Sequence, residues 1–189
     1  VHPMLAATTM PGIGTAHEEL MESLPFMNAM LAITIDGLLP GDDGGTVGLR
    51  SKTERRLKID YPLREANWEA FKFACKEMAK LQFAAGARLV SSLHNEPVIL
   101  KSVDDLAKLD DAKWERLRVR VVTAHQMGGC SMGKDPKNSV VDSKLRYHDM
   151  DNLFVVDGSV LPTSLGVNPQ ETIFGLARWA SQHVAAAVA

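Results

Sequence analysis

The spacing of apolar residues along the chain predicts a long amphipathic helix in each half. The first covers residues 64–85, where apolar side chains recur three and four positions apart and Gly86 supplies a stop. The second covers residues 169–188. Its apolar face is formed by Ile173, Leu176, Ala177, Ala180, Val184 and Ala187.

Shorter runs predict strands, minor helices and loops. Strands are expected at 31–36, 46–50, 56–61 and 88–93. Helices are expected at 16–30, with a break at Pro25, at 103–109 and at 112–118, and a loop is expected at 1–14. In the run 56–61, the charged Lys58 alternates with Leu57 and Ile59, which is typical of a strand with one solvent-facing side. The first sixty residues should therefore contain an antiparallel meander.

Length and composition are typical of a globular protein. The 189 residues suffice for one large domain or two small ones, and 46% of them are hydrophobic and 23% charged. The net charge of -2 gives no reason to expect nucleic acid or an anionic membrane as a partner. The two cysteines, Cys75 and Cys130, form no disulfide framework, and we expect no metal site.

The chain shows no targeting segment. No apolar run is long enough to span a bilayer and no signal peptide is visible, so we take the cytoplasm as the default compartment. The chain begins at Val1 rather than at a methionine. We favour a chain cut from a longer polypeptide over a processed mature N-terminus.

Candidate chemistry begins with a glycine-rich motif that runs from His125 to Gly133. Its three glycines within six residues give a backbone that can bend sharply and approach a ligand closely. A histidine at the mouth of such a loop can act as a general base near neutral pH. The alternative is a histidine that hydrogen-bonds a tight turn, and this motif alone favours that alternative.

A second motif is the apolar run 153–156, followed by Asp157, Gly158 and Ser159. This pattern is typical of a buried strand at the point where it leaves a sheet, and ligands of open α/β sheets bind at the carboxyl ends of strands. Gly158 would allow close backbone contact with a cofactor. An ordinary strand and turn would have the same pattern.

A third motif, residues 166–173, predicts the start of the last helix. Asn168 suits the N-cap, Pro169 the first helical position and Glu171 the capping-box position. A helix N-terminus carries roughly +0.5 of a charge and favours an anion. Taken alone, a purely structural cap is the simpler interpretation.

Together, the order and spacing of these motifs resemble the C-terminal region of the glucose–methanol–choline (GMC) oxidoreductase family. The resemblance covers about 65 residues up to the C-terminus. It is carried by His125 to Gly133, Val140-Val141-Asp142, Asn152 to Ser159, Pro162-Thr163 and Asn168. The versions Gly128-Gly129-Cys130 and Val167-Asn168-Pro169 are similar to those of the cholesterol oxidase and long-chain alcohol oxidase branch.

The resemblance implies an α+β fold with two parts. Residues 1–122 would form part of a substrate-binding domain, an antiparallel sheet backed by helices. Residues 123–189 would supply the active-site segment, with the C-terminal strand and helix of an FAD-binding α/β domain.

The resemblance also implies an FAD-dependent alcohol oxidase or dehydrogenase that transfers hydride from a CH–OH group to flavin N5. His125 would accept the hydroxyl proton or hydrogen-bond the forming alkoxide, and Asn168 would orient the substrate oxygen. Asp157 and Gly158 would approach the ribityl and phosphate portion of FAD. The isoalloxazine ring, whose reduced N1–C2=O edge is anionic, would lie against Asn168, Pro169 and Thr172.

The family's N-terminal fingerprint, Gly-x-Gly-x-x-Gly, does not occur in this sequence. We therefore expect the FAD-binding half to come from the rest of the same enzyme or from a second chain, with this chain inactive alone. Three alternatives remain open. They are a non-catalytic fragment or subunit that needs a partner chain for FAD, a family lyase that cleaves cyanohydrins with the same histidine, and an unrelated α+β domain.

Overall fold

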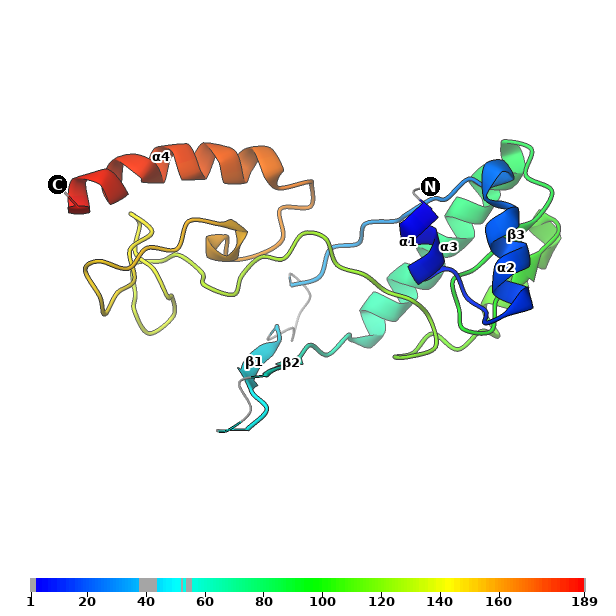
Figure 1. The fold of residues 1–189 in the computed structure, drawn as a ribbon, viewed down its shortest axis with the longest axis horizontal. Helices are drawn as coiled ribbons and strands as arrows, with labels where there is room; N and C mark the ends of the chain where they lie inside the picture. The colour runs from blue at the N-terminus through cyan, green and yellow to red at the C-terminus, as the bar shows by residue number, and fades with distance from the viewer. Residues whose placement is uncertain (1–2, 38–43, 52, 54–55, 189) are drawn as a thin grey trace. The chain divides into compact units, whose positions relative to one another are not determined.

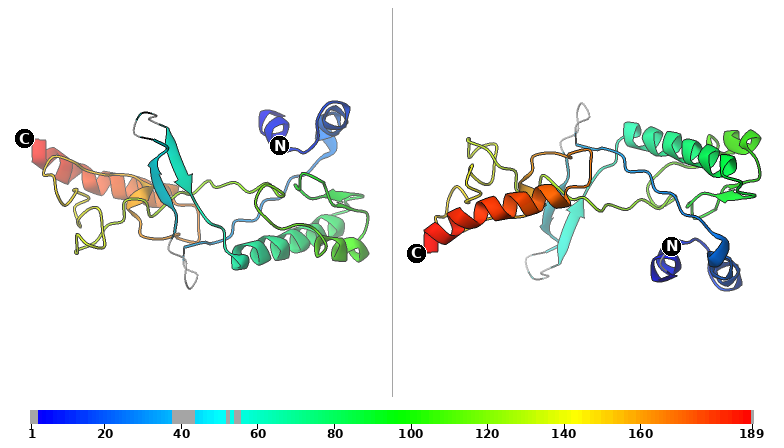
Figure 2. Two further views of the ribbon diagram at one scale, coloured as in Figure 1. Left: turned by 90° about the horizontal axis from the view of Figure 1, so that it is seen from below. Right: turned by 90° about the horizontal axis from the view of Figure 1, so that it is seen from above.

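The computed structural model describes residues 3–37, 44–51, 53 and 56–188 (Figures 1 and 2). The chain divides into two compact units. Unit 1 consists of Val1–Thr34 and Thr46–Val122, and unit 2 consists of Ile35–Gly45 and Thr123–Ala189. Helices combine with small antiparallel sheets, which confirms the predicted α+β class.

Unit 1 holds most of the regular elements. Its helices are α1 (Pro3–Thr9), α2 (Thr15–Glu22) and α3 (Glu65–Ala84), with the 3₁₀ segments η1 (Leu24–Phe26) and η2 (Val103–Leu109). Its strands are β1 (Thr46–Leu49), β2 (Leu57–Asp60), β3 (Val90–Ser91) and β4 (Ile99–Leu100). β1 pairs with β2 and β3 pairs with β4, both antiparallel.

Helix α3 confirms the helical pattern predicted at 64–85. It packs through Ala79 against Leu100 of β4 and Leu109 of η2, and these three side chains form the buried core of unit 1. The indole of Trp114 packs against this core and donates a 2.7 Å hydrogen bond to the carbonyl of Leu109. The helix stops as predicted, since Gly86 adopts φ 93°.

Three local predictions for this unit are wrong. Residues 31–36, predicted as a strand, join no ladder in the part of the chain that the structure describes. Residues 112–118, predicted as a helix, form turns in which Leu117 adopts φ 66°, a value that a right-handed helix excludes. The stretch 1–14, predicted as a loop, contains α1, whose Ala6 is fully buried. Burial of Ala6 overrides local preference in α1, whereas residues 31–36 and 112–118 are mostly exposed and gain no packing that would stabilise a strand or a helix.

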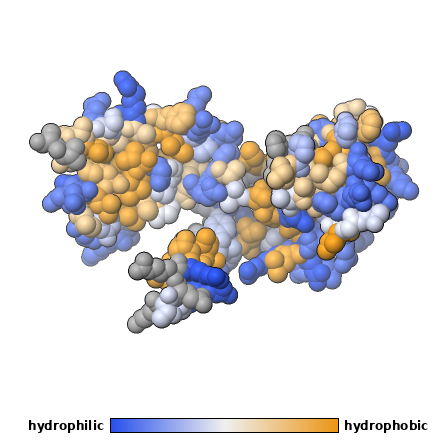
Figure 3. Space-filling model, in the orientation of Figure 1, coloured by the Kyte–Doolittle hydropathy of each residue, from blue (hydrophilic) through white to orange (hydrophobic). Residues whose placement is uncertain are grey.

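The hairpin of β1 and β2, predicted at 46–50 and 56–61, presents an uncovered apolar face. Its register sets Val47 opposite Ile59 and Leu49 opposite Leu57. Because alternate strand residues point to the same side, these four side chains share one face. They are between 59% and 70% exposed, and Figure 3 shows apolar atoms at the surface of this hairpin. No described residue covers the face.

Unit 2 is built mainly from hydrogen-bonded loops. Among its described residues the regular elements are η3 (Gly158–Val160) and α4 (Gln170–Val188), and α4 lies along the loops in Figures 1 and 2. The core consists of Val141, Leu145, Val160 and Ala180, each fully buried. The predicted apolar face of the last helix meets this core through Leu176 and Ala180, whereas Ala187 is exposed.

The strand predicted at 153–156 is not regular in the structure. Phe154 forms an isolated bridge with Arg146, and the N–H of Val155 donates to the carbonyl of Leu145 at 3.0 Å. A buried strand needs neighbours along its whole length, and the described residues provide only this short partner. The apolar run is still used, because Val155 and Val156 pack against the core of unit 2.

None of the helices within the described ranges is long and apolar enough to cross a bilayer.

A buried histidine, His94, lies in the interior of unit 1 with 3% of its surface exposed. Its ring meets the ring of Trp114 edge-on, with centroids 4.7 Å apart, and its Nδ1 lies 2.9 Å from Oγ of Ser92. Its Nε2 has no hydrogen-bond partner among the described residues. Burial disfavours the charged form of the ring and lowers the pKa of His94 below 6.5.

We expect the free energy of unfolding to fall as the pH drops below about 6.5, where an unfolded histidine takes up a proton. Because the pKa of His94 is lowered in the folded protein, the unfolded state binds more protons as the pH falls and is stabilised relative to the folded state. Urea titrations between about pH 7 and pH 5 should show a flatter pH dependence for His94→Gln than for wild type. His183→Gln controls for the loss of an imidazole. Equal slopes for His94→Gln and wild type would contradict the prediction.

Candidate functional site

The three sequence motifs meet at Gly158 in unit 2. This glycine is buried, and a Cβ atom added to it would lie 3.2 Å from the carbonyl oxygen of Gln126 and 3.1 Å from Cδ1 of Ile173. Gln126 directly follows His125 in the first motif, and Ile173 lies in the first turn of α4, five residues after Asn168. The missing side chain at Gly158 therefore allows all three motifs to pack together.

The glycine-rich loop lies directly on the segment that follows Gly158. The N–H of Cys130 donates to the carbonyl of Ser159 and the N–H of Met132 to that of Val160, both at 2.9 Å. Gly128 adopts φ 86°, and a Cβ atom there would lie 3.5 Å from the carbonyl oxygen of Pro162. Main-chain contact thus fixes the first motif against the second, as the glycine content of the loop suggested.

Asp157 has a local structural role in addition to the cofactor contact predicted for it. Its Oδ1 accepts hydrogen bonds from the N–H of Ser159 at 2.8 Å and from the Ser159 hydroxyl at 2.5 Å, so it caps η3. The side chain is exposed. Its Oδ2 accepts no hydrogen bond from any described residue, which leaves an acceptor at the surface of the motif.

Asn168 does not cap the last helix as predicted. Helix α4 begins at Gln170, and the first main-chain acceptor is Pro169, whose carbonyl receives the N–H of Ile173 at 2.8 Å. Pro169 is buried, whereas Asn168 is exposed and its amide forms no hydrogen bond within the described ranges. The helix start lies one residue later than the sequence pattern predicted, and the Asn168 amide is left available to a ligand.

His125 is similarly available. Its ring is half-buried, and it forms no hydrogen bond to the part of the chain that the structure describes. The alternative role predicted for His125 was a hydrogen bond that stabilises a tight turn, and no such bond is formed with the described residues. The side-chain hydrogen bond in this turn comes instead from Gln126, whose Nε2 donates to the carbonyl of Thr123 at 3.1 Å.

Asp142, from the Val-Val-Asp stretch, stabilises a turn. Its Oδ1 accepts the N–H of Lys144 at 2.8 Å and that of Arg146 at 3.0 Å. Partial burial alone would raise the pKa of this carboxyl. The two backbone hydrogen bonds, together with the charges of Arg146 and His148, outweigh burial and bring the pKa below its usual value. Among the described residues, no group of three or more histidines, cysteines and acids could hold a metal ion.

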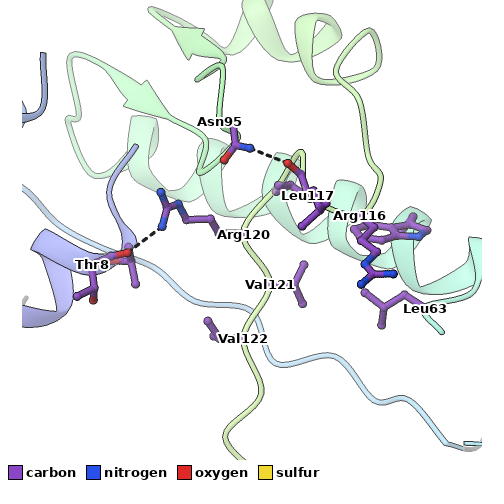
Figure 4. Close-up of a pocket in the computed structure, with 11 residues that line it drawn as sticks. Thr8, Leu63, Asn95, Arg116, Leu117, Arg120, Val121 and Val122 are labelled. Atoms are coloured by element: carbon purple, nitrogen blue, oxygen red, sulfur yellow. Dashed lines mark hydrogen bonds between the residues drawn. The ribbon is translucent and has the colours of Figure 1, made fainter. Parts of the chain in front are cut away.

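A separate hollow of about 580 Å³ lies within unit 1 (Figure 4). Its apolar lining includes Leu63, Trp68, Val119 and Val121. Polar groups are held at its edge by hydrogen bonds, from Arg120 Nη1 to the carbonyl of Thr8 at 2.8 Å and from Asn95 Nδ2 to the carbonyl of Leu117 at 2.6 Å. No local sequence pattern predicts this hollow, because its lining comes from four separate stretches of the chain.

Comparison with known proteins gives a consistent family assignment. The family model described as GMC oxidoreductase matches residues 40–177. A long-chain-alcohol oxidase of Arabidopsis thaliana is 35% identical over 144 residues, which is 71% of this chain and 19% of that protein. A second long-chain-alcohol oxidase of the same plant is 31% identical over 146 residues, again 71% and 19%. The cholesterol oxidase of Acinetobacter baumannii is 48% identical over 64 residues, 34% of this chain and 12% of that protein.

The chain therefore spans about a fifth of the length of the long-chain-alcohol oxidases that it matches.

We expect Gly158→Ala to destabilise the protein by about 1–3 kcal/mol, since the added methyl meets a main-chain oxygen and a buried side chain at close range. Gly175→Ala is the matched control. A Cβ atom at Gly175 of α4 has no neighbour within 4 Å, so alanine should stabilise the helix by about 0.5–1 kcal/mol. A urea midpoint for Gly158→Ala that is no lower than that of the wild type would contradict the packing described at Gly158.

Proposed function

Because this chain belongs to the GMC oxidoreductase family, we propose that it forms the active-site portion of an FAD-dependent enzyme that oxidises an alcohol CH–OH group. The observation that carries the proposal is the packing at Gly158, which brings the His125 loop and the Asn168 helix start into one cluster. Two side chains that can hydrogen-bond an alcohol oxygen, His125 and Asn168, thus lie in the same unit. Neither forms a hydrogen bond with the residues that the structure describes.

The residues at the start of α4 fit the electron-rich edge of a flavin. The backbone N–H groups of Gln170, Glu171 and Thr172 precede the first intrahelical bond and have no acceptor among the described residues. A helix N-terminus with free N–H groups favours negative charge. We assign Asn168, Pro169 and Thr172 to this edge of FAD. When bound, FAD supplies the acceptor for the hydride that leaves the alcohol carbon.

Asp157 and Gly158 are assigned to the ribityl and phosphate portion of FAD. Asp157 keeps a free carboxylate oxygen that can accept a hydrogen bond from a ribityl hydroxyl. The backbone at Gly158 lies at the meeting point of the three motifs, where a bound group would be adjacent to each of them.

His125 and Asn168 are assigned to the alcohol oxygen. His125 accepts the hydroxyl proton or hydrogen-bonds the forming alkoxide, and the Asn168 amide donates to the same oxygen. Two polar groups that converge on one atom orient it and stabilise the charge that develops there. The absence of competing hydrogen bonds to either side chain within the described ranges supports this assignment.

The substrate that we propose is an alcohol with a large apolar body. Two of the similar proteins are named for a long-chain alcohol and for cholesterol. The residues just before Asn168 include Leu165 and Val167, which are 38% and 64% exposed. Unit 1 also contains the apolar hollow, which supports substrate binding as the role of residues 1–122, with residues 123–189 as the active-site segment.

A further part of the enzyme is needed for FAD binding. The sequence has no Gly-x-Gly-x-x-Gly fingerprint, and its match covers only 19% of the long-chain-alcohol oxidase of Arabidopsis thaliana. The uncovered apolar face of the β1–β2 hairpin offers a surface for such a part to bury. We propose that the rest of the same polypeptide, or a second chain, supplies the FAD-binding half, and that this chain alone is inactive.

In the complete, FAD-loaded enzyme, we expect His125→Ala to lower kcat by about 10²–10⁴-fold, and Asn168→Ala to lower it by about 10²–10³-fold. FAD content, measured by absorbance after gel filtration, should stay near the wild-type value. His183→Ala is the histidine control, and it should keep its kcat because His183 lies on α4 outside the three motifs.

Near-normal turnover in both active-site variants would refute the assignment of these residues. Mixing the enzyme with a long-chain alcohol without oxygen distinguishes the reaction types. Bleaching of the flavin supports alcohol oxidation, whereas an unchanged flavin with cleavage of a cyanohydrin identifies a lyase.

A further inference from the structure

We propose that residues 35–37, here called the clamp segment, position the loop that carries Asn168. This loop comprises residues 163–168 and is called the Asn168 loop below. The proposal concerns a positioning role and rests on the proposed function only where it predicts turnover. The clamp segment and the Asn168 loop both belong to unit 2, although residues 46–122 of unit 1 lie between them in the sequence.

The first contact between them is a hydrogen bond. The hydroxyl of Thr163 donates to the carbonyl oxygen of Gly37 at 3.2 Å, across 126 positions of the chain. Such a bond fixes the beginning of the Asn168 loop to a segment that no local sequence pattern connects with it.

The second contact is steric. Gly166 adopts φ 71°, and a Cβ atom added to it would lie 3.0 Å from Cδ1 of Ile35. The side chain of Ile35 therefore fills the space that a side chain at position 166 would need. The clamp segment touches the Asn168 loop at both its first residue and its middle.

The Asn168 loop has little else to hold it. No backbone–backbone hydrogen bond among the described residues involves residues 162–168. The hydrogen bond from the N–H of Gly166 to Oγ of Ser164, at 3.4 Å, is internal to the loop. A loop without main-chain partners opens easily unless side-chain contacts restrain it. The position of Asn168 therefore depends on the buried Pro169 that follows it and, within the loop, on the two contacts with the clamp segment.

This dependence matters for catalysis if Asn168 orients the alcohol oxygen. A displacement of about 1 Å in a positioning group can lower the rate on the order of 10²-fold. The clamp segment itself need not touch substrate or flavin. Its loss should lower kcat more than it changes KM, while FAD stays bound.

The test compares Thr163→Val with Thr163→Ser in the complete, FAD-loaded enzyme. Valine keeps the shape of threonine and removes the donor, whereas serine keeps the donor. Cleavage of the native enzyme within residues 163–168 by a broad-specificity protease should be roughly fivefold faster in Thr163→Val, the effect of one lost hydrogen bond, and near wild type in Thr163→Ser. The kcat of Thr163→Val should fall, with FAD content unchanged. A wild-type cleavage rate in Thr163→Val would overturn the proposal.

A double-mutant cycle tests the steric contact independently. Gly166→Ala should speed proteolytic cleavage in the Asn168 loop, and by a smaller factor when Ile35→Ala has already removed the neighbouring side chain. Gly128→Ala is the matched control, because Gly128 also has a positive φ but faces Pro162. Its effect on the cleavage rate should be the same with and without Ile35→Ala. Additive effects of Gly166→Ala and Ile35→Ala would overturn the steric contact.

The cleavage measurements do not depend on the reaction. If Thr163→Val speeds cleavage but the wild-type enzyme oxidises no alcohol, the positioning role stands and the proposed function fails. If the wild type oxidises alcohol but the cleavage rate is the same in all variants, the proposed function stands and the positioning role fails.

Discussion

Main-chain hydrogen bonds between the glycine-rich loop and the segment after Gly158 determine the arrangement of unit 2. The bonds from Cys130 to Ser159 and from Met132 to Val160 fix two irregular segments side by side without a regular sheet. Since buried main-chain groups must be paired, this pairing also allows Val160 to enter the core, where Ala180 of α4 covers it. The loop that begins at His125 is thus placed by backbone contacts rather than by the chemistry of its side chains.

The segments of the site pack closely, yet the side chains of His125 and Asn168 form no hydrogen bond with the described residues. Gly158 brings Gln126 and Ile173 into contact range, and both of these residues adjoin or follow a candidate catalytic residue. The neighbouring Asp142 behaves differently, because its carboxylate is committed to backbone N–H groups that hold a turn. Asp142 is therefore a structural residue, whereas the side chains of His125 and Asn168 form no hydrogen bond with the described residues and can bind a ligand.

The two units differ in how they are stabilised. Unit 1 has a core formed by one long helix, α3, and the short elements packed on Ala79. Unit 2 has few regular elements and relies on loop pairing, on α4 and on residues 35–37, which come from far away in the sequence. Residues 163–168 contact the distant residues 35–37 at Thr163 and Gly166, so a small change in that packing would change the position of Asn168.

The sequence by itself determined the features that depend on near neighbours in the chain. It predicted α3 and its stop at Gly86, the strands β1 and β2, most of α4, and the family to which the chain belongs. Helical periodicity and glycine stops are local, so a short window is enough to detect them. The tertiary structure decided what depends on partners distant in sequence. Residues 31–36 and 153–156 have strand-like sequences without long partner strands among the described residues, and the contact of Ile35 with Gly166 leaves no trace in either local pattern. The meeting of three motifs at one buried glycine is of the same kind, because close packing between separate segments is fixed only when the whole unit folds.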